Sequence, residues 1–144
     1  MIADVQDEKG QNVAASIGPD SCTYIHCDET DEDQVKSLVD STISLYGRLD
    51  IMFSNAGTIG TLGSQLAIDM DMSVFDKLIA VNVRGMAASV KHAARAMKEG
   101  GVKGSIIYPA SVMGTRGYHV GTDYVLSKHA VLGMVRSASL QLAG

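Results

Sequence analysis

The segment from Ser105 to Lys128 constrains the fold more than any other part of the sequence. It opens with a short apolar run, Ser105-Ile106-Ile107-Tyr108, which predicts a buried strand. Glycines then mark a loop, at Gly114, Gly117 and Gly121. From Thr122 onward the apolar residues recur with a helical period. A strand that leads through a loop into a helix favours an α/β fold.

Two residues of that helix form a chemically specific pair. Tyr124 and Lys128 stand four residues apart, so both side chains lie on one helix face. A free phenol has a pKa near ~10, and a nearby ammonium favours the phenolate. Tyr124 is therefore a candidate general acid/base, and the Ser111 hydroxyl is placed to bond the same substrate oxygen. This combination suits carbonyl–alcohol interconversion with a hydride carrier. Taken alone, such a pair is more often an exposed helix surface.

The rest of the chain repeats short apolar runs and longer helical segments. Strands are predicted at Thr23–Cys27 and Leu49–Phe53, and Met1–Asp4 has the pattern of the end of a strand. Thr30, followed by three acids, is predicted to cap a helix that stops at Gly47. Ser73 is predicted to cap a long helix that contains Asn82.

Four motifs together resemble the short-chain dehydrogenase/reductase family. They occur in the family's order, at Ser54-Asn55-Ala56-Gly57, Val81-Asn82-Val83, Ser111 and Tyr124-x-x-x-Lys128. The likeness covers nearly all of the chain and is strongest from Tyr124 to Gly133. The sequence most resembles plant NAD-linked alcohol dehydrogenases that act on terpenoid, steroid or lignan alcohols. The resemblance implies a Rossmann-type, doubly wound parallel sheet, with residues 1–144 forming one partial domain.

The resemblance also implies that the family fold is incomplete here. In the family, Met1–Asp4 is where the second strand ends, so we expect the first strand, the glycine-rich loop and the first helix to be missing. The C-terminal lid and last strand are expected to be missing too. Gly57, Gly60 and Gly63 do not replace the glycine-rich loop, because they lack the G-x-G-x-x-G spacing. The alternative to an enzyme is therefore a catalytically silent truncated homologue that acts through subunit pairing.

The catalytic roles follow from the resemblance. Tyr124 would exchange the proton, while Lys128 would lower the phenol pKa and hold the nicotinamide ribose. Ser111 would orient the substrate oxygen. Asn82 would sit at a helix kink that holds a water, which links the lysine to bulk solvent. Without the resemblance, an asparagine in the middle of a helix would be interpreted as a solvent-facing side chain.

The expected cofactor is NAD, with NADP less favoured. Asp4 stands where a Rossmann fold places an acid that bonds the adenosine ribose and repels a 2′-phosphate. The alternative is a solvated loop aspartate. By resemblance, Asp28 would contact the adenine amino group, while Asn55-Ala56-Gly57 would line the adenosine side. Glu29 departs from the apolar residue usual in the family, which affects the expected adenine packing.

Composition sets the remaining expectations. The chain is 46% hydrophobic and 19% charged with net charge -4, which is ordinary for a globular protein and does not favour nucleic acid. No apolar run approaches the ~20 residues of a membrane span. Cys22 and Cys27 lack a metal-site spacing, so we expect no metal and free thiols in the cytoplasm. The expected partners are a small alcohol or ketone and, by resemblance, further copies of the chain in a homo-oligomer.

Overall fold

Short strands alternate with helices along the whole chain. A computed structural model describes residues 1–61 and 65–143, so Gly63 lies outside the described residues. The elements are β1 (Ile2–Asp4), α1 (Asp7–Ile17), β2 (Tyr24–His26), α2 (Glu32–Tyr46), β3 (Ile51–Phe53), α3 (Met72–Ile79), the π-helical segment η1 (Ala80–Gly85), α4 (Met86–Glu99), β4 (Ser105–Ile107), the 3-10 turn η2 (Val112–Gly114) and α5 (Thr122–Leu142). The predicted α/β class is confirmed.

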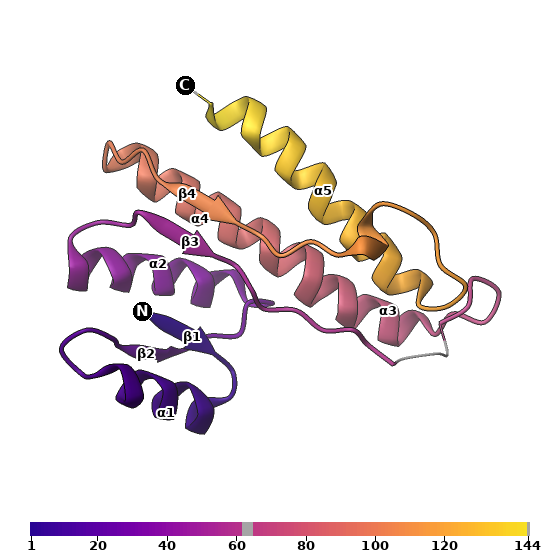
Figure 1. The fold of residues 1–144 in the computed structure, drawn as a ribbon, viewed down its shortest axis with the longest axis horizontal. Helices are drawn as coiled ribbons and strands as arrows, with labels where there is room; N and C mark the ends of the chain where they lie inside the picture. The colour runs from indigo at the N-terminus through magenta and orange to yellow at the C-terminus, as the bar shows by residue number, and fades with distance from the viewer. Residues whose placement is uncertain (62–64, 144) are drawn as a thin grey trace.

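The four strands of the described residues all pair in parallel. β1 pairs with β2, with Ala3 opposite Ile25, and β3 pairs with β4, with Met52 opposite Ile106. The described strands form these two pairs and not one continuous ladder. Figure 1 shows the strand arrows pointing the same way, with α1 beside the β1–β2 pair, β4 drawn across α4, and β3 drawn between α4 and α2. The carboxyl ends of the strands therefore lie toward one side, where parallel α/β sheets bind ligands.

The core lies between the strands, α2 and α4. One cluster is formed by Val39, Leu49, Ala93 and Met97, with Met52 and Ile106 packed against it. A second cluster is formed by Cys27, Val35 and Ala88, with Ile25 and Leu38 beside it. Both clusters join α2 to α4, so burial of these apolar side chains fixes the helices against one face of the strands.

The prediction that Ser105–Tyr108 forms a buried strand is wrong about burial: the strand covers Ser105–Ile107, Ile106 and Tyr108 are only half-buried, and the other two residues are exposed. Successive strand side chains point to opposite faces, so Ile106 meets the core while Ile107 points away from it. Ile107 is 47% exposed, and Ile51 and Phe53 of β3 are 62% and 58% exposed. The second face of this strand pair is not covered by any helix among the described residues.

Two helix starts also differ from the prediction. Asp31, not Thr30, caps α2, because its carboxylate accepts hydrogen bonds from the backbone N–H groups of Asp33 and Gln34. Asp71, not Ser73, caps α3 in the same way. Gly47 ends α2 as predicted, with a φ of 80° that favours glycine.

Candidate active site

Tyr124 and Lys128 lie in the first two turns of α5 and are both half-buried. The Lys128 Nζ atom is 5.6 Å from the centre of the Tyr124 ring, within the range of a cation–π contact. It also donates a hydrogen bond of 3.3 Å to the Pro109 carbonyl oxygen. The helical spacing inferred from the sequence thus places the ammonium beside the phenol ring and next to the carboxyl end of β4.

Ser111 caps η2, the short turn that connects β4 to the loop before α5. Its Oγ accepts a hydrogen bond of 3.2 Å from the Met113 backbone N–H. η2 packs closely on α5, since a methyl group on Gly114 would lie 2.7 Å from the Lys128 carbonyl oxygen. The structure therefore brings the turn that carries Ser111 against the helix of Tyr124. No hydrogen bond joins the two side chains in the part of the chain that the structure describes.

Asn82 is 4% exposed and lies in η1. Its Oδ1 accepts a 2.8 Å hydrogen bond from the Thr58 N–H, and its Nδ2 donates 2.7 Å to the Thr58 carbonyl. Nδ2 also donates a hydrogen bond of 3.1 Å to the Ser127 Oγ. The Ser127 hydroxyl in turn donates a hydrogen bond of 2.8 Å to the Tyr124 carbonyl oxygen. The solvent-facing alternative is therefore wrong. A π-helical turn inside a helix is frequent at functional sites, and here it directs Asn82 to the turn that carries Tyr124.

The two predicted adenosine-binding acids lie at the carboxyl ends of two strands: Asp4 is the last residue of β1, and Asp28 comes two residues after β2. Asp4 is exposed, and its Oδ1 accepts a 2.9 Å hydrogen bond from the Gln6 N–H, which leaves its second carboxylate oxygen for a ligand. The Asp28 Oδ1 accepts from both the N–H and the hydroxyl of Thr30, at 2.9 and 2.8 Å. Asp28 therefore shapes the start of α2 in addition to any contact with a ligand.

The predicted segment Asn55-Ala56-Gly57 follows β3 and is exposed. The Asn55 N–H bonds the Phe53 carbonyl at 3.1 Å, which turns the chain at the end of the strand. Gly57 lies beside Asn82, since a methyl group there would be 3.4 Å from Asn82 Oδ1. The small residues leave the backbone of this segment open to a ligand.

Sequence reasoning missed two buried carboxyl groups. Asp123 is 1% exposed, and its Oδ1 accepts a 2.8 Å hydrogen bond from the Tyr124 N–H at the start of α5. Glu29 lies between β2 and α2, and its Oε1 is buried without a hydrogen-bond partner among the described residues. The pKa of Glu29 is raised to about 7, chiefly by burial and also by the charge of Asp28, while the charge of Lys128 acts in the opposite direction. The sequence showed that Glu29 replaces the apolar residue usual in the family, but it did not show which groups surround Glu29 in the fold.

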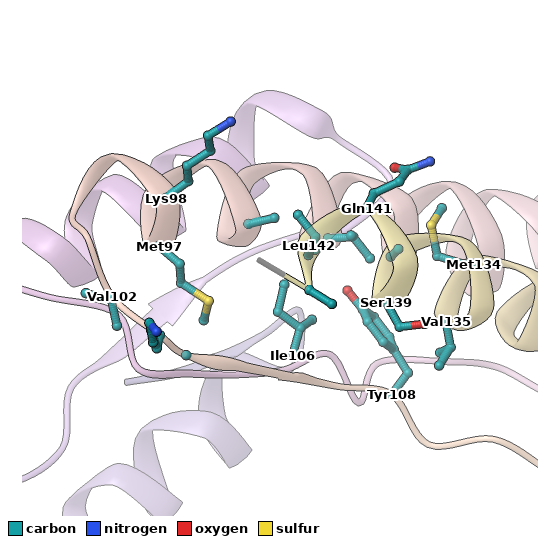
Figure 2. A pocket seen from close by; sticks show the side chains of 16 residues that line it. Met97, Lys98, Val102, Ile106, Tyr108, Met134, Val135, Ser139, Gln141 and Leu142 are labelled. Atoms are coloured by element: carbon teal, nitrogen blue, oxygen red, sulfur yellow. The ribbon is translucent and has the colours of Figure 1, made fainter.

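A cavity of about 690 Å³ lies away from these groups, between α4, β4 and the C-terminal half of α5. Figure 2 shows its lining, in which Met97, Ile106 and Leu142 converge. None of the predicted site residues lines it. Within residues 1–61 and 65–143, no cluster of three metal-ligating side chains occurs, and no helix is both long and apolar enough to cross a membrane.

A family model described as Enoyl-(Acyl carrier protein) reductase matches residues 1–144. The short-chain dehydrogenase reductase 3b of Arabidopsis thaliana is 49% identical over 139 residues. The chain belongs to the short-chain dehydrogenase/reductase family. The predicted resemblance to its plant members is confirmed.

Named plant relatives are close in sequence. (+)-cis,cis-Nepetalactol synthase NEPS3 of Nepeta racemosa is 53% identical over 142 residues, which cover 99% of this chain and 52% of that protein. (-)-Isopiperitenol/(-)-carveol dehydrogenase, mitochondrial, of Mentha piperita is 53% identical, with 99% and 53% covered. The chain spans about half the length of the curated relatives it matches.

Solved structures show the same fold. NAD+-bound xylitol dehydrogenase superimposes with a TM-score of 0.88 at 29% identity, covering 98% of this chain and 54% of that chain. ElxO with NADP bound superimposes with a TM-score of 0.88 at 27% identity, covering 99% and 57%. The Rossmann-type fold is thereby confirmed, and the two neighbours bind different nicotinamide cofactors.

Proposed function

We propose that this chain carries the catalytic centre of an NAD-linked oxidoreductase. It would interconvert a secondary alcohol and a ketone on a hydrophobic, cyclic substrate of terpenoid, steroid or lignan type. The observation that carries the proposal is the placement of Lys128 Nζ, 5.6 Å from the Tyr124 ring centre. This pair lies beside the carboxyl end of β4, at the side of the strands where α/β proteins bind ligands.

Each residue has a defined part in the proposed reaction. During reduction, the Tyr124 hydroxyl gives a proton to the carbonyl oxygen, and it accepts that proton back during oxidation. Ser111 orients the substrate oxygen, and Lys128 supplies positive charge beside the phenol. Asn82 positions the turn of α5 that carries Tyr124, through Ser127. The bound nicotinamide cofactor would accept the hydride as NAD+ during oxidation and donate it as NADH during reduction.

The residues present fit both ends of NAD. Asp4 and the exposed segment Asn55-Ala56-Gly57 are available to the adenosine, and Lys128 is available to the nicotinamide ribose. The sequence contains no G-x-G-x-x-G run for the diphosphate. The free carboxylate oxygen of Asp4 supports NAD over NADP, because a 2′-phosphate placed there would be repelled.

The loop before α5 supports a hydrophobic substrate. It exposes Val112, Tyr118 and Val120, which lie between Ser111 and Tyr124 in the chain. Exposed apolar side chains next to polar catalytic groups are typical of a small-molecule site. The names of the two plant relatives, a nepetalactol synthase and an isopiperitenol/carveol dehydrogenase, support a terpenoid.

Two measurements test the proposal. Calorimetric titration with NAD separates it from a silent homologue, because the 144-residue chain is expected to bind NAD. A spectrophotometric assay of NADH formation with a panel of cyclic terpene alcohols tests the chemistry, and chromatography of the products detects any reaction without redox change. Tyr124→Phe is expected to lower kcat by roughly 100-fold or more. Tyr46→Phe, on the exposed end of α2, is the matched control.

Full activity in Tyr124→Phe would remove that residue from the proposed role. The proposal also includes a homo-oligomer, which light scattering tests, and a reducing, cytoplasmic location, which imaging of a tagged protein tests. Both cysteines are free among the described residues, which supports a reducing compartment.

A further inference from the structure

A tyrosine of β2 packs directly against the first helix. A methyl group on Gly10 of α1 would lie 2.1 and 2.4 Å from two carbons of the Tyr24 ring, so the ring rests on the helix backbone. Only a residue without a side chain leaves this space at position 10. This contact places the Tyr24 hydroxyl at the turn between β1 and α1.

The Tyr24 hydroxyl connects the two ends of that turn. It lies 2.7 Å from the carbonyl oxygen of Asp4, the last residue of β1, and 2.6 Å from the Oδ1 atom of Asp7, the first residue of α1. Its single hydrogen is shared between these two acceptors. The Asp4 carbonyl also accepts a 3.2 Å hydrogen bond from the Cys27 N–H, so residues on and just after β2 hold the end of β1.

A second donor contacts the Asp7 carboxylate. The His26 Nδ1 atom lies 2.7 Å from the same oxygen, Oδ1. The hydrogen bonds from Tyr24 and His26 hold the pKa of Asp7 below its ordinary value, so the carboxylate is ionised at neutral pH. An ionised carboxylate only accepts hydrogen bonds, so Nδ1 carries the hydrogen. Charge-assisted hydrogen bonds of this kind are roughly twice as strong as neutral ones.

The carboxylate of Asp4 is oriented within this turn. Asp4 Oδ1 accepts the 2.9 Å hydrogen bond from the Gln6 N–H. Gln6 immediately precedes Asp7 in the chain, so a displacement of Asp7 would also displace the N–H that holds the Asp4 carboxylate. The orientation of this carboxylate therefore depends on the contacts of Asp7 with Tyr24 and His26.

We propose that Asp7 is a positioning residue, which through Tyr24 fixes the turn that orients the Asp4 carboxylate toward the adenosine ribose of the cofactor. The effect on cofactor binding rests on the proposed function, whereas the effect on the turn does not. An acid in the first turn of a helix also has a general favourable effect on the helix dipole. Glu8 shares that general effect, and it provides a control that separates the two roles.

The turn is tested in the cofactor-free 144-residue chain by amide hydrogen exchange. In both Asp7→Asn and Tyr24→Phe, the Gln6 N–H is expected to exchange roughly fivefold faster or more, because its hydrogen bond to the Asp4 carboxylate opens more often. Both substitutions keep the shape of the side chain, and Tyr24→Phe keeps the ring on the helix. Glu8→Gln is the matched control, since it removes the other acid of the same helical turn. Equal exchange in Asp7→Asn and Glu8→Gln would overturn the proposal.

Calorimetric titration tests the consequence for the cofactor. Wild type is expected to bind NAD roughly tenfold more tightly than an NAD that lacks the adenosine 2′-hydroxyl, as a hydrogen bond to the charged Asp4 predicts. This preference should fall at least about threefold in Asp7→Asn and be absent in Asp4→Ala. Adding Asp7→Asn to Asp4→Ala should change the preference no further, because Asp7 acts through Asp4. A general loss of stability would weaken both ligands alike and leave their ratio unchanged.

The possible results separate this proposal from the proposed function. A preference that is absent in wild type or unchanged in Asp7→Asn would overturn the positioning role. A further loss in the double variant would overturn it too, because Asp7 would then act independently of Asp4. If wild type bound no NAD while the Gln6 exchange still responded to Asp7→Asn, the proposed function would fail and the assignment of the turn would stand.

Discussion

Replacing Glu29 with glutamine should change how stability depends on pH. The carboxyl is half-buried, its Oε1 is unpartnered among the described residues, and burial raises its pKa from 4.5 to about 7. The folded state therefore favours the protonated form. This contribution to stability is fully present below about pH 4.5, falls as the pH rises, and is lost above about pH 7. Glutamine keeps the shape of the side chain and is neutral throughout.

The size of the effect follows from the two pKa values. The difference between 4.5 and about 7 corresponds to about 3 kcal/mol, at about 1.4 kcal/mol for each pH unit. Since Glu29 is only half-buried, water lowers this figure, and we expect Glu29→Gln to be more stable than wild type by about 1–3 kcal/mol at pH 8. At low pH the two proteins should be nearly equal, because both side chains are then neutral.

The assay is urea unfolding followed by circular dichroism at about pH 4.5 and about pH 8. The carboxylates that cap α2 and α3 titrate in both proteins, so they cancel in the difference between them. Glu99→Gln, in the exposed last turn of α4, is the control for loss of a glutamate charge. If wild type and Glu29→Gln differ by the same amount at both pH values, the burial argument is refuted.

Three further predictions concern the fold around the site, each measured by urea unfolding. Asn82→Ala should cost roughly 2–4 kcal/mol, because its buried partners in the loop and in α5 lose their hydrogen bonds; a cost below about 1 kcal/mol would contradict this. Asp31→Ala should lower the free energy of unfolding by about 1 kcal/mol, and Thr30→Ala should lower it by less. If Thr30→Ala had the larger effect, Thr30 would be the cap, as the sequence predicted. Gly114→Ala should cost roughly 1–3 kcal/mol, because the new methyl meets the backbone of Lys128, and a neutral substitution would show that η2 does not pack there as described.

Secondary structure, which depends on residues that are close in the sequence, was predictable. The pattern of short apolar runs and helical periods located all four strands and the long helices, because period and turn residues act over a few positions. The caps were each misplaced, since Asp31 and Asp71 compete with nearby Thr30 and Ser73 for the same amide groups. Which of two nearby polar residues adopts the extended cap conformation depends on the direction from which the preceding segment approaches the helix, and the tertiary fold sets that direction.

Burial was less predictable than secondary structure. A run such as Ser105–Tyr108 is apolar on both faces, which suggested a strand covered on both sides. In the described residues only the Ile106 face of the strand is covered. The sequence of a strand does not encode whether a helix covers its second face, so the exposure of Ile107 could not be predicted from it.

The sequence by itself determined that Tyr124 and Lys128 share a helix face, because a helix repeats every 3.6 residues wherever it lies. Only the tertiary structure decided what surrounds them. It directed Asn82 inward to Ser127, and it placed the side chain of Glu29 beside Gly85. These residues are far apart in the sequence and come together only because separate helices and strands pack against one another. The local sequence around each residue does not encode which other residues it will contact.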